Sequence, residues 1–359
     1  MKQYLDLLKK VHDEGIDRPD RTGTGRRSIF GEQLRFKMSD GLPLVTTRKI
    51  TSNAAIAELI WFISGSSDTK QLKELGTGIW DRWAVTKEDT DKFFDEHKDK
   101  ARINKDELRN VLDDSVGSIG PLYGANWRNA PQSVLNTLWP KIALEDIPRE
   151  KLAHYKEQYR LASLNDELEL SEEEFCKLSY RTTVDQLNEL IINLRDRPYS
   201  ARHVVSAWIP ELVPFETLSP QDNVLLGKGA LTACHMAFQC FVHKPIDDTS
   251  KARLSLQVYI RSSDVPIGLP YNISQYAILL HLLAHVSNME ADELIVTTGD
   301  THIYTDQLPL VKHQLARVPL KLPTISINPD LKDIFEVKVS DITINNYNHA
   351  NVIRYPVST

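Results

Sequence analysis

The sequence has few cysteines, no long apolar run and no concentrated positive charge. Its 359 residues include 3 cysteines, too few for a disulfide framework, and this scarcity fits a reducing cytoplasm. Cys234 and Cys240 lack a second Cys or His pair at zinc spacing, so we expect no metal. No stretch is long enough for a membrane span, and the N-terminus predicts an amphipathic helix rather than a signal peptide. With a net charge of −6 and no basic stripe, direct nucleic-acid binding is not expected.

The residues that are present predict a globular protein with a large core. The composition is 41% hydrophobic and 26% charged. Apolar periodicity predicts helices at 4–14, 51–64, 184–194 and 273–287. Alternating or continuous apolar runs predict strands at 28–36, 235–243, 254–263 and 294–298, and a buried strand that begins with 204–207. The order of these elements favours an α+β fold, a mixed or antiparallel sheet flanked by helices.

Charged stretches interrupt this pattern. Residues 85–116 and 131–180 are rich in charged side chains, and we expect them to be helical insertions on the surface. The run Ser171-Glu-Glu-Glu174 resembles a capping box that opens a short helix. A further insertion is expected at 215–229, where extra residues precede Cys234.

Two residues indicate chemistry. Cys234 precedes a strand-like segment, where a thiol near polar or cationic groups can ionise and attack an electron-poor carbon. A cysteine is also a common small buried hydrophobe, so this position alone does not decide the matter. Glu58 lies within a strongly apolar helix, where a carboxylate is costly to bury unless it has a partner or a function.

Several separated stretches resemble the thymidylate synthase family, which includes the pyrimidine nucleotide hydroxymethylases. The resemblance covers most of the chain outside the insertions and implies one catalytic domain over 1–359 with a thymidylate-synthase-like fold. The matching stretches are Asp20-Arg-Thr-Gly-Thr-Gly25, Ile79-Trp-Asp81, Gly120-Pro-Leu-Tyr-Gly124, Cys234-His235, Arg261-Ser-Ser-Asp264, Gly268-Leu-Pro-Tyr-Asn272 and Gly299-Asp-Thr-His-Ile-Tyr304.

The resemblance implies transfer of a one-carbon unit from 5,10-methylenetetrahydrofolate to C5 of a pyrimidine nucleotide. Cys234 matches the nucleophile, which adds to C6 and turns C5 into an enolate-type nucleophile. Glu58 matches the group that organises proton transfers near the C4 oxygen, and Tyr123 the group that helps to remove the C5 proton. His235 resembles a polar pocket residue beside the thiol, although a satisfied strand histidine is the alternative.

Further matches imply how substrates bind. Arg21, Arg261 and Ser262 match phosphate ligands, since Arg forks suit phosphate oxygens. Arg202 matches an arginine donated from the other subunit, which implies a homodimer. The remaining matches are His302 and Tyr304 for the sugar hydroxyl, and Asp264, Trp80 and Gly268 for folate.

Asn272 bears on the choice of base. Its amide can donate to the uracil C4 oxygen and accept from N3–H, whereas cytosine presents the opposite pattern. Deoxycytidylate-specific members of the family carry Asp at this place. The residue therefore favours dUMP, although a flipped amide could present the complementary pattern.

Departures from the family pattern bear on the last reaction step. A polar C-terminus and an altered pocket could admit water in place of hydride. We therefore prefer a phage-type deoxyuridylate hydroxymethylase that makes 5-hydroxymethyl-dUMP for modified DNA, located in the host cytoplasm if phage-encoded. Thymidylate synthase is the alternative, and the retained Trp80 favours it. Further alternatives are a cytidylate hydroxymethylase and an inactive regulatory homologue. The departures are Ser118, Ala201, Ile209, Ala233, Ile260 and the terminus Tyr355-Pro-Val-Ser-Thr359.

Overall fold

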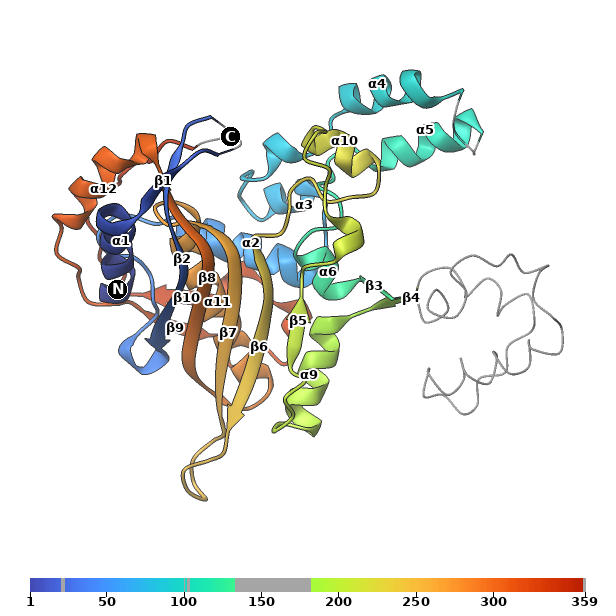
Figure 1. Cartoon of the computed structure of the whole chain (residues 1–359). Coiled ribbons are helices and arrows are strands. Elements are labelled where there is room, and N and C mark those ends of the chain that lie inside the picture. Colours follow the sequence, from blue (N-terminus) through green and yellow to red (C-terminus); the bar gives the residue numbers. More distant parts are fainter. Residues whose placement is uncertain (21–22, 100, 102–103, 133–181, 358–359) are drawn as a thin grey trace, which may run out of the picture.

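The computed structural model describes residues 1–20, 23–99, 101, 104–132 and 182–357, and its main sheet has six strands (Figure 1). Their order is β1-β2-β8-β7-β6-β5, and β9–β10 and β3–β4 form separate two-stranded ladders. The strands are β1 Ile16–Arg18, β2 Arg26–Lys37, β3 Ala130–Gln132, β4 Thr182–Val184, β5 Val204–Ser206, β6 His235–His243, β7 Arg253–Asp264, β8 Glu290–Tyr304, β9 Thr324–Ile327 and β10 Ile342–Asn345.

One parallel pair makes the main sheet mixed. β7 and β8 run in the same direction, whereas their other neighbours in the sheet are antiparallel. Parallel neighbours need a crossover connection, and α11 (Gly268–Val286) provides it. The predicted α+β fold, a mixed sheet flanked by helices, is confirmed.

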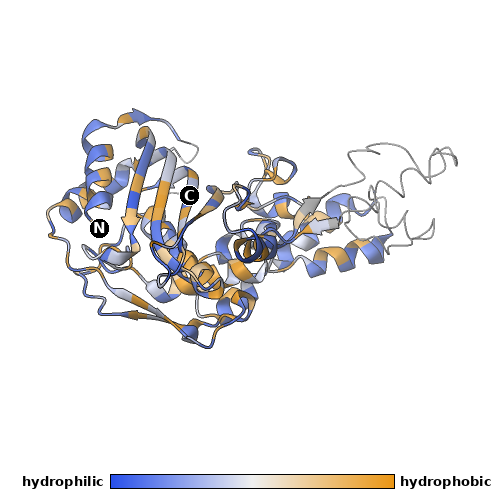
Figure 2. Cartoon of the chain, turned by 90° about the horizontal axis from the view of Figure 1, so that it is seen from below, coloured by the Kyte–Doolittle hydropathy of each residue, from blue (hydrophilic) through white to orange (hydrophobic). Residues whose placement is uncertain are grey.

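The core lies between the sheet and two apolar helices. α11 is buried around most of its circumference and packs against β7, β8 and α2 (Ser52–Ser64). Figure 2 shows hydrophobic residues gathered toward the interior and hydrophilic residues along the outer helices. The other helices are α1 Lys2–Glu14, α3 Thr69–Glu74, α4 Lys87–His97, α5 Lys105–Asp114, α6 Gly124–Arg128, α9 Gln186–Asp196, α10 Pro220–Leu225 and α12 Leu308–Leu315, with 3-10 turns η1 Met38–Asp40, η2 Asp81–Trp83, η4 Pro210–Leu212, η5 Thr305–Gln307, η6 Ile334–Glu336 and η7 Val339–Asp341.

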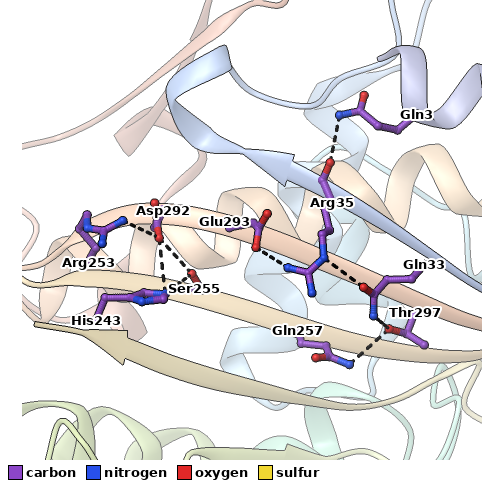
Figure 3. Close-up of polar contacts among 10 residues, drawn as sticks. All are labelled: Gln3, Gln33, Arg35, His243, Arg253, Ser255, Gln257, Asp292, Glu293 and Thr297. Carbon is purple, nitrogen blue, oxygen red and sulfur yellow. Dashed lines mark hydrogen bonds and ion pairs between the residues drawn. The ribbon is translucent and has the colours of Figure 1, made fainter.

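The two faces of the main sheet differ in polarity, as the alternation of side chains along a strand requires. Alternate residues on the opposite face form polar contacts between strands (Figure 3). Gln33 and Gln257 donate from either side to Thr297 Oγ1, at 3.2 and 3.3 Å. The residues of β7 that point into the core are fully buried: Leu254, Leu256, Val258 and Ile260.

Two helices begin at other residues than predicted. α11 begins at Gly268 rather than 273, because the chain turns into the helix directly after β7. The Asp264 carboxylate stabilises this turn by accepting the Ile267 N–H at 3.0 Å. α9 begins at Gln186 rather than 184, because Asp185 caps its first turn. Local hydrogen bonds thus set boundaries that apolar periodicity alone did not locate.

Two strand predictions also need correction. Val204 was predicted in a buried strand but is 47% exposed, because it lies on the outer face of the sheet opposite the exposed Gln239, whereas Val205 on the other face is buried. The expected alternation of β6 fails at its start, where a bulge lies between His235 and Ala237. As a result, His235 is buried while Met236 is only half-buried. The bulge aims His235 inward, beside the candidate nucleophile.

The charged stretch 85–116 folds as a helical hairpin made of α4 and α5. Lys87 on α4 pairs with Asp91 at 3.1 Å and with Asp113 on α5 at 2.7 Å. These side chains are largely exposed, as expected for a surface insertion. The stretch 215–229 contains α10, which packs against α4. Residues 133–180 of the third predicted insertion, including the capping box at Ser171, lie outside the described residues.

Candidate active site

The sheet topology brings several of the predicted site residues to one edge. Because β7 and β8 are parallel, their carboxyl ends, with Asp264 and Tyr304, lie side by side. β6 is antiparallel to β7, so its first residues, next to Cys234, lie at the same edge. α11 begins directly after β7 and adds Asn272 from its first turns. Residues far apart in the sequence therefore meet in one site.

Cys234 is a free, half-buried thiol with a firmly held backbone. Its N–H donates to the Tyr123 hydroxyl at 3.0 Å, and its carbonyl accepts the Arg261 N–H at 2.8 Å. The Arg261 guanidinium also donates to the carbonyls of Ala233 and Thr232, at 2.9 and 3.0 Å. These bonds hold the segment that carries the thiol while leaving the thiol accessible.

Tyr123 and His235 form a stacked pair beside this cysteine. Their ring centroids are 3.9 Å apart and their planes differ by 14°. His235 Nδ1 lies 2.8 Å from the Tyr276 hydroxyl, and burial lowers the pKa of His235 to about 3. Burial raises the pKa of Tyr123 well above its usual range, and the charges of Cys234 and Glu58 raise it further. The resting site thus has a neutral imidazole against a neutral phenol.

Tyr123 adopts an uncommon backbone conformation. Its φ is +43°, in a region that aromatic residues seldom occupy. The next residue, Gly124, begins α6 so close to α2 that a Cβ there would lie 2.2 Å from the Phe62 carbonyl oxygen. The close approach of these two helices therefore presents the Tyr123 hydroxyl to Cys234.

Glu58 faces this site from α2 with both carboxyl oxygens hydrogen-bonded. Trp80 Nε1 donates to Oε1 at 2.6 Å, and Gln275 Nε2 donates to Oε2. Burial raises the pKa of Glu58, while the two hydrogen bonds oppose that rise by stabilising the carboxylate. The carboxyl has neutral donors as partners, and such a group is suited to exchanging a proton near neutral pH.

One face of α11 supplies several groups to the site. Asn272, Gln275 and Tyr276 follow the spacing of three and four residues that places side chains on one face of a helix. Asn272 is half-buried, and its amide has no hydrogen-bond partner in the part of the chain that the structure describes. Sequence reasoning missed Gln275 and Tyr276, although their spacing from Asn272 was an available signal. Gly268, a predicted folate-site residue, begins this helix.

His302 belongs to a charged chain on β8. Its Nδ1 lies 3.1 Å from Asp300 Oδ1, and Asp300 Oδ2 accepts from Arg26 Nη2 at 2.9 Å. The ring of Tyr304 meets that of His302 edge-on, with centroids 5.2 Å apart. The role of Asp300 was not predicted, although residues two apart on a strand share a face.

Asp264 lies deep at the same edge. Burial raises the pKa of its carboxyl, while hydrogen bonds from the Ile267 N–H and from Gln307 oppose that rise. Gln307 Nε2 is 3.3 Å from Asp264 Oδ2 and also donates to the Pro356 carbonyl at 3.1 Å. Gln307 therefore connects the C-terminal segment to the predicted folate site.

The predicted phosphate ligands are not all brought together. Arg261 and the half-buried Ser262 lie on β7 near the thiol. Arg202 is exposed, and its guanidinium contacts no charged or hydrogen-bonding group of residues 1–20, 23–99, 101, 104–132 or 182–357. Arg21 lies outside the described residues.

The site places a free thiol near a buried carboxyl, an arrangement of the kind that covalent catalysis by cysteine uses. The chain matches the family described as thymidylate synthase over residues 2–359, and it belongs to that family. Membership indicates a folate-dependent one-carbon transferase of nucleotide biosynthesis, with methylenetetrahydrofolate as co-substrate. Among the described helices none is long and apolar enough to cross a bilayer. The same residues contain no cluster of three or more His, Cys, Asp or Glu side chains placed to hold a metal ion.

Proposed function

We propose that the protein transfers a one-carbon unit from 5,10-methylenetetrahydrofolate to C5 of dUMP and releases 5-hydroxymethyl-dUMP. The observation that carries this proposal is the accessible Cys234, bonded through its backbone to Tyr123, beside the buried carboxyl of Glu58. Residues 1–359 act as one catalytic unit, to which the charged insertions are additions.

Covalent addition at C6 begins the reaction. A bond forms between Cys234 Sγ and C6, and the C5–C6 π electrons move to the C4 oxygen, so C5 becomes nucleophilic. C5 attacks the methylene carbon of the folate co-substrate, and the bond from that carbon to the folate nitrogen breaks as tetrahydrofolate leaves. Glu58 then exchanges a proton with the C4 oxygen, and Tyr123 relays the proton that leaves C5. Both groups lie within the network around the thiol, as these steps require. The bond between Cys234 Sγ and C6 breaks in the last step, which restores the thiolate and the C5–C6 double bond.

Asn272 selects uracil. Its amide is free of partners among the described residues, so it can donate to the C4 oxygen and accept from N3–H. Cytosine has an amino group at C4 and no proton on N3, so it would mismatch both ends of the amide in this orientation and would require the flipped one. Turnover of dCMP at a rate comparable to dUMP would contradict this assignment.

The remaining substrate groups have matching donors. In the described structure, Arg261 uses Nε and Nη2 on backbone carbonyls, which leaves Nη1 for the nucleotide phosphate beside Ser262. Arg21 and an Arg202 from a second subunit complete the phosphate site in this proposal. His302 and Tyr304 bind the sugar hydroxyl; Asp300 holds His302 Nδ1, so Nε2 is left for the ligand.

The folate site fits the residues present. Trp80 offers an indole ring, and its N–H is already used on Glu58. Asp264 is a buried carboxyl that can accept from N–H groups of a pterin-like ring, and Gly268 leaves space at the start of α11. These are the aromatic and acceptor groups that a flat ring with amide-like edges requires.

Water completes the reaction in this proposal, and the exposure of Val357 supports it. Val357 is 61% exposed, and the residues after it in the sequence, Ser358 and Thr359, are polar. Hydride transfer needs a site sealed from water, whereas addition of water to the exocyclic methylene needs an ordered water molecule there. This difference favours the hydroxymethylated product.

Thymidylate synthase activity, giving dTMP and dihydrofolate, is the second candidate. The indole of Trp80 lies 5.9 Å from the Tyr123 ring between centroids and hydrogen-bonds Glu58. An aromatic side chain in this place would shield the exocyclic methylene from solvent, and this favours hydride transfer.

We further propose that the protein is a homodimer that packs through the exposed face of its main sheet. Large apolar side chains lie on this face beside the polar contacts of Figure 3, with Phe241 62% and Tyr259 39% exposed. Such a face fits burial against a second copy. Arg202 lies directly before β5 at the edge of the sheet, where it could reach across. Sedimentation as a monomer at micromolar concentration would contradict this arrangement.

Purified protein with dUMP and methylenetetrahydrofolate tests the chemistry. The absorbance of dihydrofolate is followed while the nucleotide product is identified by mass. We expect a hydroxymethylated product without a rise in absorbance. A methylated product with rising absorbance would assign thymidylate synthase instead. If the unmodified protein, like Cys234→Ser, made no product, an inactive homologue would be favoured.

A further inference from the structure

The two oxygens of Glu58 have neighbours of different chemical capacity. Trp80 Nε1 is a donor only, so the Oε1 atom that it contacts at 2.6 Å must remain an acceptor in every protonation state. Because the carbonyl oxygen of a protonated carboxyl accepts more strongly than its hydroxyl oxygen, a proton taken up by Glu58 favours Oε2. Gln275 occupies that side of the carboxyl.

Gln275 suits this place because an amide can donate or accept. Its Nε2 donates to Glu58 Oε2 and lies 3.4 Å from the Ala55 carbonyl on the same helix as Glu58. Rotation of the amide would present its carbonyl oxygen to a protonated Oε2. Gln275 is 3% exposed, so water does not readily replace it in either state.

We propose that Gln275 is a positioning residue that holds Glu58 in both protonation states and confines its exchangeable proton to Oε2. The inference rests on the proposed function, in which Glu58 handles the proton at the C4 oxygen. In each cycle one O–H bond forms at Oε2 and later breaks, and the proton moves to or from the substrate or its water. No other bond of Glu58 or Gln275 changes.

The ionisable groups around Glu58 do not mask the effect of Gln275 on the pKa of Glu58. Tyr123, at the start of α6, interacts with Glu58 and remains a neutral phenol, and Cys234 and His235 lie beyond it. On α11 the neighbour Tyr276 is engaged with His235. The charged side chains of the elements that pack on α2 are exposed or half-buried: Arg128 of α6, Lys70, Lys73 and Glu74 of α3, Glu336 of η6, and Asp341 of η7. Arg128 is engaged with Asp185 at 2.7 Å and with the Ile63 carbonyl at 2.8 Å. Neutral hydrogen bonds, rather than a cation, thus oppose the burial of Glu58.

Loss of the amide should move the titration of Glu58 upward. Gln275→Leu removes the donor that stabilises the carboxylate, so burial raises the pKa of Glu58 further. Gln275→Glu keeps the shape but sets a second carboxyl against the first, which raises it more. A higher pKa moves the pH-rate limb of Glu58 to higher pH whether the reaction needs its ionised or its protonated form.

The experiment follows release of tritium from C5 of 5-tritiated dUMP, a step common to both product types, between about pH 5 and about pH 9. We expect the Glu58 limb to move up by about one pH unit in Gln275→Leu and further in Gln275→Glu. Gln314→Leu is the matched control: this buried glutamine donates to Thr47 and accepts from Tyr355, not Glu58, so its loss should leave the limb in place.

If the pH-rate limb of both Gln275 variants coincides with that of the unmodified protein, the inference is overturned, even if turnover falls. Should Gln275→Leu fail to fold, Gln275→Glu decides the matter by itself. If the unmodified protein releases no tritium, the proposed function fails instead, so the two failures are distinguishable.

Discussion

The two ends of β6 carry the same pair of residue types in opposite circumstances. At the site end, Cys234 is half-buried and accessible, and His235 is buried between Tyr123 and Tyr276. Toward the far end, Cys240 is in the core, where burial raises the pKa of its thiol to about 12. His243 is half-exposed there.

The difference lies in what surrounds each end. His243 Nε2 lies 3.0 Å from Ser255 Oγ and 3.5 Å from Asp292, contacts that belong to the polar sheet face of Figure 3. Cys240 is enclosed by apolar side chains, so its thiol is inert. A thiol or an imidazole gains a chemical role only where access to substrate and an ordered polar network coincide. That coincidence occurs at the end of β6 where the strand bulges.

The largest expected effect separates the two cysteines. Cys234→Ser replaces the nucleophile by a poorly ionising hydroxyl, and we expect turnover of dUMP to fall by about 10⁴-fold or more. Cys240→Ser, the matched control, should keep turnover within about threefold, because it contacts no group of the site. Tritium release from C5 measures both. Comparable losses in the two variants would break the comparison.

Stability should respond in the opposite order. Cys240→Ser puts a hydroxyl into an apolar environment, and we expect the free energy of unfolding to fall by about 1–3 kcal/mol. Cys234→Ser should change it by less than about 0.5 kcal/mol, because the thiol is half-exposed. Urea denaturation measures both values. If Cys234→Ser proved the more destabilising, the thiol at the site would have a structural role instead.

The pH dependence of stability should report His235. Its pKa is about 3 when folded, against about 6.5 in an unfolded chain, so the unfolded state binds a proton first as pH falls. The contribution of neutral His235 is therefore present above about pH 6.5 and is lost toward pH 3, with a slope of up to about 1.4 kcal/mol per pH unit. His235→Phe should flatten the measured curve by that amount. An unchanged slope would mean that His235 is not buried as a neutral ring.

The smallest effect is expected at the other histidine. His243→Gln alters a half-exposed contact on the sheet face, and such contacts contribute little. We expect the free energy of unfolding to change by less than about 0.5 kcal/mol and turnover to stay unaltered. If sedimentation showed that this variant loses the dimer, the sheet face would form a tighter interface than its contacts indicate.

Sequence reasoning located most elements, and the fold brings several of the predicted site residues to one edge of the sheet. The helix at 51–64 and the strand at 235–243 were predicted because apolar periodicity is a local property. Predictions failed where a distant contact decided the outcome. Val204 is exposed because its side of the sheet is not covered, and Met236 changes face because of the bulge.

Local sequence patterns could not predict the hydrogen-bond partners of the site residues. The bond from Gln275 to Glu58 depends on the crossing of α11 over α2, and the chain from Arg26 through Asp300 to His302 depends on β2 lying beside β8. Residue types and spacing show which groups share a face of their own helix or strand. They do not show which element lies opposite, because that depends on the summed packing of the whole chain. The sequence thus determines which chemical groups the protein has, whereas the fold determines which partners surround them.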